Sequence, residues 1–431
     1  MTSICDFLKE IGFIQTWQDM QPVEEAFIDH MEKGLKGQPS SLPMLAAYLT
    51  TDTLHDESST VLVMDAGGTN LRVFEVQLEP GQKPKVLYQS KQPMPGKEKP
   101  LTRTEFFRQM AEAVLPVAEH SDRIGLCFSF PCRIRPDFDG EILYLDKEIT
   151  VEGIEGALVA EGLCAALADM GCKAKHRVVV LNDTVAALLG ALAEHPAECF
   201  SGYIGMILGT GTNCCYLERN DRVQKDATLQ SRPGSSIINM EAGAFNALPI
   251  TKADVWVSRG AKVAEQNLAE KMMSGAYQGR LLDGLITCAI EAGCFSDAFA
   301  ARYHAVDSGL TAVDISAFTL MPAHPGRLHA LAGEGEDAQA LYALVDALLE
   351  RAAMLAVMNL TAIMRYTGSG RDPLKPVCVA IEGTTFAKNE AFRQKIHAYL
   401  IEYTQKVRGY HCRVFSTEDA NMVGSAIAAR G

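Results

Sequence analysis

Residues 61–78 read VLVMDAGGTNLRVFEVQL, two apolar runs joined by a turn that contains consecutive glycines. Runs this rich in valine, leucine and phenylalanine favour β-strands, so we expect one strand over 61–66 and a second over 71–78. The same order recurs at 203–218, where YIGMIL is followed by GTGTN and CCYLE. Two strand–glycine turn–strand units in one chain predict two similar halves that face each other across a cleft.

Both turns have the composition of a phosphate-binding site. Glycine lets backbone N–H groups approach phosphate oxygens closely, and a threonine hydroxyl adds a donor. Asp65, at the end of the first strand, can hold Mg²⁺ through water, because this ion keeps much of its hydration shell. Arg72 can add a charged donor. The predicted phosphate-binding residues are Asp65, Gly67, Gly68, Thr69, Asn70 and Arg72 in the first turn and Gly209, Thr210 and Gly211 in the second.

Other interpretations of these turns differ in strength. For the first turn taken alone, an ordinary hairpin is an equally good interpretation. Neither turn is a P-loop, because the lysine is missing and a strand rather than a helix follows, and neither matches the dinucleotide-binding glycine pattern. A third turn, Gly383-Thr384, also follows a β-rich run. Three such turns at strand ends favour phosphate binding over chance.

The segment Asn182-Asp183-Thr184 follows the β-branched run RVVVL and precedes a helical pattern. These residue types are common helix N-caps, which gives a purely structural interpretation. The functional interpretation is that Asp183 accepts the proton of an attacking alcohol while Asn182 holds a neighbouring hydroxyl. Phosphoryl transfer depends mainly on positioned charges and geometry, so one carboxylate can serve as the base. Further candidates for binding vicinal hydroxyls are Ser129, Lys147, Asn213, Glu241 and Glu270.

Bulk properties limit the class of protein. A length of 431 residues predicts two domains, because a single core stops growing at about 250–300 residues. The formal net charge of −13 argues against nucleic acid and anionic membranes as partners. Twelve cysteines without a C-x-x-C pair argue against a zinc site and a disulfide scaffold. No signal-peptide pattern or long apolar run is present, so we expect a cytoplasmic protein.

The rest of the chain is predicted to be largely helical. Helical spacing of apolar residues occurs over 24–35, 155–172 and 338–366, and the composition of 255–350 is mostly helical. Loops are expected at 305–310 and 321–337.

Nine segments resemble, in the same order, the hexokinase family of the actin-like ATPase superfamily, and the chain is most similar to its single-unit, bacterial-like members. These segments are SLPML (41–45), MDAGGTNLRV (64–73), FSFPC (128–132), LNDTVAALL (181–189), IGMILGTGTNCCY (204–216), INMEAGAF (238–245), LAEKMMSGAYQGRLL (268–282), IEGTTF (381–386) and GSAIAA (424–429). They cover nearly the whole chain, and their combination is highly specific.

The resemblance implies a role for each matching residue. Asp183 would be the catalytic base. The sugar ligands would be Ser129, Asp146, Lys147, Asn182, Asn213, Glu241 and Glu270. The phosphate residues of the first two turns would bind ATP with Mg²⁺, and Gly383 and Thr384 would lie near the nucleoside.

The resemblance also implies an α/β fold of two ribonuclease-H-like domains with an interdomain cleft. The smaller domain would span 58–181 with part of 419–431, and the larger would span 1–57 and 182–418. Several positions depart from the family pattern. Asp146 stands where a hydroxyl is usual, Ala242 where an aromatic residue is common, Met422 where the adenosine turn has small residues, and Glu382 in place of an aspartate.

The implied activity is transfer of a phosphoryl group from MgATP to the 6-hydroxyl of glucose or a related hexose, giving hexose 6-phosphate and ADP. The alternatives are a kinase for mannose, fructose or an N-acetyl amino sugar, and a weakly active, sugar-sensing relative. A filament-forming ATPase would leave the NDT, INME and LAEK segments without a purpose. The preferred hexose and the oligomeric state stay open.

Overall fold

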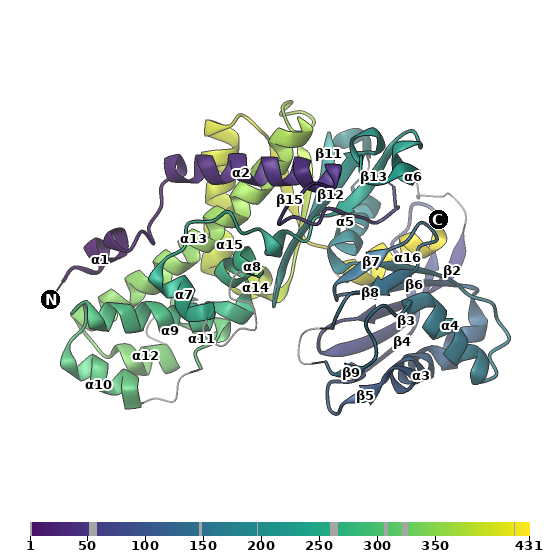
Figure 1. Ribbon diagram of the computed structural model, residues 1–431, viewed down its shortest axis with the longest axis horizontal. Coiled ribbons are helices and arrows are strands. Elements are labelled where there is room, and N and C mark those ends of the chain that lie inside the picture. The colour runs from purple at the N-terminus through teal and green to yellow at the C-terminus, as the bar shows by residue number, and fades with distance from the viewer. Residues whose placement is uncertain are drawn as a thin grey trace.

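The structure is a computed structural model that describes residues 2–50, 58–145, 149–195, 197–258, 266–305, 309–320, 326–417 and 419–431. Two separate sheets organise it into two lobes (Figure 1). We call the five-stranded sheet with helices α3, α4 and α16 the small lobe, and the six-stranded sheet with the remaining helices the large lobe. None of the helices within these ranges combines the length and apolar composition that a bilayer crossing requires.

The strands of the small-lobe sheet are β2 (Ser59–Ala66), β3 (Asn70–Leu78), β4 (Lys85–Pro93), β6 (Arg123–Phe128) and β10 (Arg177–Leu181). The strands of the large-lobe sheet are β1 (Leu45–Ala46), β11 (Gly202–Leu208), β12 (Thr212–Arg219), β13 (Ser235–Asn239), β14 (Val377–Glu382) and β15 (Cys412–Phe415). Two short pairs complete the strands: β5 (Leu101–Thr102) with β9 (Val151–Glu152), and β7 (Cys132–Ile134) with β8 (Gly140–Ile142).

The two sheets share one topology. In spatial order they are β4-β3-β2-β6-β10 and β13-β12-β11-β14-β15, with β1 added at the edge of the large-lobe sheet beside β13. In each sheet the first three strands along the chain are antiparallel, and the last two are parallel to the first. The predicted strand–glycine turn–strand units are confirmed as β2–β3 and β11–β12. The prediction of two similar halves is therefore confirmed at the level of the sheets.

Helices surround the two sheets, and several in the large lobe pack on other helices rather than on a strand. In the small lobe they are α3 (Arg103–Val114), α4 (Val159–Asp169) and α16 (Ala420–Arg430). In the large lobe they are α1 (Ile4–Glu10), α2 (Trp17–Lys36), α5 (Asp183–Glu194), α6 (Ala227–Gln230), α7 (Lys252–Ser258), α8 (Leu268–Met273), α9 (Gly275–Glu291), α10 (Asp297–Ala305), α11 (Ala312–Leu320), α12 (Arg327–Ala332), α13 (Glu336–Thr367), α14 (Thr384–Lys388) and α15 (Glu390–Tyr399). A π-helical turn, Leu400–Val407, follows α15.

Alternation along β2 explains how the small lobe is layered. Successive strand residues point to opposite faces. Leu62 and Met64 accordingly share a core with α3 and α4, whereas Val61 and Val63 share one with α16. Both faces of the strand are buried, which is why VLVM is continuously apolar.

Two helices connect the lobes, because each follows the last strand of one sheet and packs on the other sheet. The chain leaves the last small-lobe strand, β10, and enters α5, which packs on β11 and β14 of the large lobe. It leaves the last large-lobe strand, β15, and enters α16, which packs on β2 and β6 of the small lobe. These helices also pack on each other, at a point where a Cβ on Gly424 would lie 1.9 Å from the carbonyl oxygen of Ala186.

One loop prediction is partly wrong. Residues 327–332, expected within a loop, form α12, because Leu328, Leu331 and Ala332 are buried against the large-lobe core. Residues 321–325 of the same expected loop lie outside the described residues. The domain boundaries at residues 58 and 181 stay a proposal, for which the two separate sheets are the basis.

Candidate active site

A cleft of about 960 Å³ lies between the lobes and is lined by the ends of strands from both sheets. Every residue that the sequence predicts to bind phosphate or nucleoside lines it. These residues are Asp65, Gly67, Gly68, Thr69, Asn70, Arg72, Gly209, Thr210, Gly211, Gly383 and Thr384. Five further polar residues that line it were not singled out from the sequence: Lys91, Lys97, Tyr277, Thr417 and Asp419. Asn421, which belongs to the expected adenosine turn, lines it as well.

A smaller pocket adjoins this cleft. The structure brings six predicted sugar-binding and catalytic residues together around it: Ser129, Asn182, Asp183, Asn213, Glu241 and Glu270. Tyr144 and Asn267 also line it. Asp183 and Ser129 line both the pocket and the cleft. The predicted sugar ligands Asp146 and Lys147 lie outside the described residues.

Asp183 occupies the first turn of α5, directly after β10. Its Oδ1 accepts a hydrogen bond from the backbone N–H of Thr184 at 2.8 Å, which fixes the carboxylate against the helix. The neighbouring Asn182 is the N-cap, and its side-chain oxygen accepts from the same N–H at 2.9 Å. The capping interpretation of this segment is therefore confirmed for Asn182. Within the described residues, Oδ2 of Asp183 has no hydrogen-bond partner and can accept a proton from a bound alcohol.

A row of hydrogen-bonded amide side chains connects Asn182, the residue before Asp183, to Glu241. Nδ2 of Asn213 donates to Oδ1 of Asn239 at 2.7 Å and, more weakly, to Oδ1 of Asn182 at 3.4 Å. Nδ2 of Asn239 donates to Oε1 of Glu241 at 2.8 Å. The sequence prediction missed Asn239, although it lies two residues before Glu241, and alternate residues of an extended segment share a face.

The hydrogen-bonding groups of the Asn213 side chain are all paired within the protein. Its Oδ1 accepts from the backbone N–H groups of Cys214 at 2.7 Å and Ala242 at 3.0 Å, and both of its N–H donors are engaged in the amide row. Nδ2 of Asn182, in contrast, has no partner within the described residues and is free to donate to a hydroxyl. Of these two predicted ligands, the geometry favours Asn182 for direct contact with a sugar and Asn213 for holding its neighbours.

The two glutamates of the pocket depend on unusual backbone positions and small neighbours. Glu241 has a left-handed backbone, with φ of 54°, which turns its side chain into the pocket after β13. Oε2 of Glu270 accepts from the backbone N–H of Thr212 at 3.2 Å. A Cβ on Gly211 would lie 2.6 Å from the same oxygen, so glycine is required there for the glutamate to reach the second turn.

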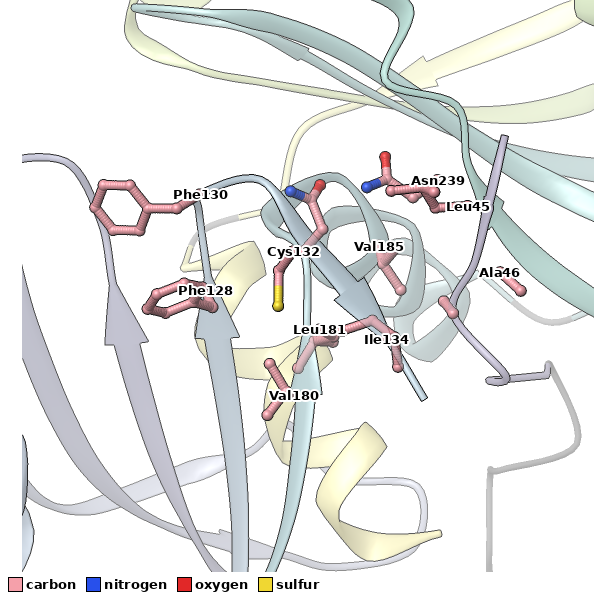
Figure 2. Close-up of a pocket in the computed structure, with 12 residues that line it drawn as sticks. Leu45, Ala46, Phe128, Phe130, Cys132, Ile134, Val180, Leu181, Val185 and Asn239 are labelled. Carbon is pink, nitrogen blue, oxygen red and sulfur yellow. The ribbon is translucent and has the colours of Figure 1, made fainter. Parts of the chain in front are cut away.

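An apolar layer backs the amides. Figure 2 shows side chains that line a small cavity, contributed by β1, β6, β7, β10 and the residues that follow them. Its wall is formed by Leu45, Ala46, Ala47, Phe128, Phe130, Cys132, Ile134, Val180, Leu181 and Val185, together with the amides Asn182 and Asn239. Hydrogen bonds in such low-dielectric surroundings are electrostatically strong, so the amide row is held rigidly.

Two carboxylates and one arginine form an ion-pair cluster at the wall of the cleft. Asp65 is almost fully buried and pairs with Arg72, whose Nε donates to Oδ2 at 3.0 Å. Nη1 of Arg72 lies 3.4 Å from Oδ1 of Asp419. The arginine is therefore held by two carboxylates, and its predicted role in donating hydrogen bonds to phosphate stays a prediction.

A buried thiol lies near the same carboxylates. Burial, with the charges of Asp65 and Asp183, raises the pKa of the Cys127 thiol well above its ordinary value, so this thiol stays neutral.

The donor set fits magnesium better than a metal held entirely by protein. Among the described residues, no group of three or more His, Cys, Asp or Glu side chains could hold a metal ion. Mg²⁺ is usually held by one or two carboxylates, substrate phosphates and water. Asp65 supplies one such carboxylate at the wall of the cleft, and its Oδ1 has only a weak contact, 3.4 Å from Nδ2 of Asn421.

The second and third glycine turns pack directly on each other. A Cβ on Gly209 would lie 3.4 Å from Cα of Gly383, and one on Gly383 would lie 2.5 Å from the carbonyl oxygen of Leu208. Oγ1 of Thr385 donates to the carbonyl oxygen of Gly209 at 2.8 Å. At Gly383 the backbone approach is close enough to require glycine, whereas a Cβ on Gly209 would make an ordinary contact.

Glu382 lies at the far end of the same cleft wall. Burial raises its pKa above the ordinary value, although its carboxylate accepts from the backbone N–H of Thr417 at 2.7 Å and from Oγ of Ser416 at 3.2 Å. These two bonds attach the end of β14 to the segment that leads into α16.

Comparison with known proteins gives consistent matches across the chain. Two family models, both described as hexokinase, match residues 9–192 and 203–430. Hexokinase-1 of Schizosaccharomyces pombe is 26% identical over 428 residues, which cover 94% of this chain and 86% of that protein. A hexokinase of Schistosoma mansoni is 26% identical over 437 residues, which cover 95% of this chain and 93% of that protein.

Solved structures show the same fold. The hexokinase from Schistosoma mansoni complexed with glucose matches with a TM-score of 0.79 at 24% identity, over 100% of both chains. A ROK family glucokinase from Streptomyces griseus, in complex with glucose and AMPPNP, matches with a TM-score of 0.52 at 17% identity, over 86% of this chain and 99% of that one. The two-lobed α/β architecture is thus that of hexokinases and related kinases. Since one family model alone spans more than half of the residues, the chain belongs to the hexokinase family.

Proposed function

We propose that this protein is an ATP-dependent hexokinase that transfers the terminal phosphoryl group of MgATP to the 6-hydroxyl of glucose or a related hexose. The observation that carries the proposal is the position of Asp183, which lines both the smaller pocket and the nucleotide cleft. A base at this junction can contact a sugar hydroxyl on one side while that hydroxyl faces the phosphate turns on the other. Membership of the hexokinase family supports both substrates.

The pocket residues would bind the sugar before the chemical step. Glu241 and Glu270 would accept hydrogen bonds from sugar hydroxyls, and Nδ2 of Asn182 would donate one. Asp183 would then take the proton of the 6-hydroxyl on Oδ2 as the oxygen attacks phosphorus. The backbone N–H groups of the glycine turns and the hydroxyl of Thr210 would stabilise the charge on the transferred group. Mg²⁺, held beside Asp65, would neutralise charge on the phosphates.

Closure of the lobes would complete the site. Ser129 reaches the pocket from the small lobe, whereas Glu241 and Glu270 reach it from the large lobe. A sugar that contacts both lobes favours their closed arrangement, which excludes water as a competing acceptor.

Replacement of Asp183 tests the proposal. Asp183→Ala should lower kcat by roughly a hundredfold to ten-thousandfold, the usual contribution of a positioned acid–base group. The dissociation constant for glucose should change little. Sugar-dependent ADP formation is the measurement, with a no-sugar sample as background and Asp169→Asn, an exposed carboxylate at the end of α4, as the matched control.

Near-normal turnover of Asp183→Ala would contradict the assignment of the base. A panel of glucose, mannose, fructose and N-acetylglucosamine, assayed in the same way, identifies the preferred acceptor. Sugar binding without sugar-dependent ADP formation by the wild-type protein would instead support the sensing alternative.

The cytoplasmic location is also a proposal. All twelve cysteines are free thiols, four of them fully or nearly fully buried beside the active site: Cys127, Cys132, Cys214 and Cys215. Free thiols in this number suit a reducing compartment.

A further inference from the structure

The nucleotide cleft contains a lysine that the proposed mechanism does not use. Lys97 lines the cleft beside the first glycine turn, and its Nζ donates to the carbonyl oxygen of Gly68 at 3.5 Å. The side chain is half-buried. It forms no ion pair with any carboxylate of the described residues. A positive charge is therefore held next to the predicted phosphate site without a partner of opposite charge.

A tight turn fixes the backbone that carries this lysine. The N–H of Lys97 donates to the carbonyl oxygen of Met94 at 3.2 Å, and Gly96 has a φ of 84°. With Pro95 at the second position and glycine at the third, this is the arrangement of a type II β-turn. The N–H of Met94 donates to the carbonyl oxygen of Thr69 at 3.1 Å, which attaches the turn directly to the phosphate turn.

The far side of the turn is also fixed. The carbonyl oxygen of Gly96 accepts from the N–H of Thr150 at 3.0 Å. A Cβ at position 96 would lie 3.0 Å from Cγ2 of Val151 and 3.1 Å from Cγ2 of Ile149, a tight fit at a position whose positive φ already favours glycine. Residues 94–96 are buried, and the lysine side chain is the part of the turn that extends into the cleft.

The charges of the cleft explain why another cation is needed. A nucleoside triphosphate brings several negative charges into a cleft whose walls already contain Asp65, Asp419 and Glu382. Arg72 lines the same cleft, but Asp65 and Asp419 already hold it. Lys91 also lines the cleft, but its side chain is exposed. The bond from Lys97 to Gly68 is longer than the usual 2.7–3.2 Å range, so exchanging it for a phosphate oxygen costs little.

We propose that Lys97 binds the phosphate tail of the nucleotide, as a point charge presented by the Met94–Lys97 turn. It acts beside the backbone donors of the first glycine turn, where a P-loop protein would use the lysine of its own motif. The inference rests on the proposed function, because it assigns Lys97 to the phosphate side of that site. The chemistry it recognises is a chain of phosphates, with or without a nucleoside.

The test compares Lys97→Gln with Lys97→Arg, which keeps the charge, and with Lys99→Gln, which removes an exposed lysine outside the cleft lining. Titration calorimetry with glucose and Mg²⁺ present measures binding of a non-hydrolysable ATP analogue, inorganic tripolyphosphate and adenosine. Lys97→Gln should weaken binding of the analogue and of tripolyphosphate by about tenfold to a hundredfold, the range for a lost charged hydrogen bond. Adenosine and glucose should bind as to the wild type. Lys97→Arg should retain most of the affinity.

Steady-state kinetics give a second readout. In Lys97→Gln the KM for MgATP should rise while the KM for the hexose stays within about twofold, a split that general destabilisation would not produce. Wild-type affinity of Lys97→Gln for both the analogue and tripolyphosphate would overturn this inference and leave the proposed function standing. Failure of the wild-type protein to bind the ATP analogue would overturn both.

Discussion

Asn239 shows how one side chain can determine the geometry of a site that it does not line. Its amide accepts from Asn213 at 2.7 Å and donates to Glu241 at 2.8 Å, so it connects two predicted sugar residues. It is nearly fully buried, and an unsatisfied donor left there would cost about 1–3 kcal/mol. The rotamers of its two partners therefore depend on it.

Asn239→Ala should raise the KM for the hexose by about tenfold to a hundredfold, because Glu241 and Asn213 lose the bonds that orient them. The KM for MgATP should stay near the wild-type value. The matched control is Asn220→Ala, which removes a buried asparagine that hydrogen-bonds to Pro233 away from the cleft. Equal hexose KM values for the two variants, measured by ADP release, would show that Asn239 has no positioning role.

Residue types at the turns were predictable, and their partners were not. Gly67, Gly209 and Gly383 follow apolar strands, and local sequence is sufficient to recognise such turns. Of the three, Gly383 is the one whose positive φ and 2.5 Å approach to the carbonyl oxygen of Leu208 require glycine. Arg72 was predicted to bind phosphate, but its interaction with Asp419 joins residues 347 positions apart. No spacing rule identifies a pair that only the packing of α16 brings together.

At the scale of elements, the close packing of α16 on α5 and β6 depends on glycine at the points of contact. A Cβ on Gly424 would meet the carbonyl oxygen of Ala186 at 1.9 Å, and one on Gly125 of β6 would meet that of Ser425 at 2.0 Å. Helix α16 is thus wedged between β6 and α5 at distances that only glycine permits. Neither contact involves the flexible end of a side chain that could move away.

Gly424→Ala should destabilise the protein by about 1–3 kcal/mol, the usual cost of overpacking a fixed core. Helix propensity alone predicts the opposite sign, a gain of about 1 kcal/mol for replacing glycine within a helix. Urea unfolding of the variant and the wild type therefore distinguishes the two effects. A higher midpoint for the variant would mean that the two helices can separate without loss.

The sequence predicted the type of an element correctly where its apolar residues kept one spacing over many residues. The expected helix over 338–366 appears as α13, Glu336–Thr367, because its apolar positions keep helical spacing throughout. Helix α12 was missed because RLHALA is short and flanked by glycines, which favour a loop locally. Burial of Leu328 and Leu331 against the large lobe outweighs that preference.

At the scale of the whole molecule, residues of both lobes line the smaller pocket, so we expect ligand binding and lobe arrangement to be coupled. The prediction of two halves rested on the repeated strand–turn–strand unit, and the matching strand orders of the two sheets confirm it. The packing of α5 on the large-lobe sheet and of α16 on the small-lobe sheet could not be predicted, because helical patterns do not specify which sheet a helix covers.

Glucose should lower the radius of gyration measured by small-angle X-ray scattering, since a ligand held from both sides favours the closed arrangement. Glu270→Ala should show no decrease at the same glucose concentration, because it removes a large-lobe contact. Adding glucose to saturation for this variant should restore the decrease. An unchanged radius for wild-type protein saturated with glucose and MgATP would contradict the coupling.

The position of α16 also has a consequence for synthesis of the chain. Asn421 lies 356 residues after Asp65, yet its helix covers the apolar face of β2 that Val61 and Val63 form. At about 5–20 residues per second, a ribosome needs roughly 20–70 s to make that stretch. During this time the first sheet has one bare hydrophobic surface. Nascent small lobe should therefore be a target for chaperones until the last helix has emerged.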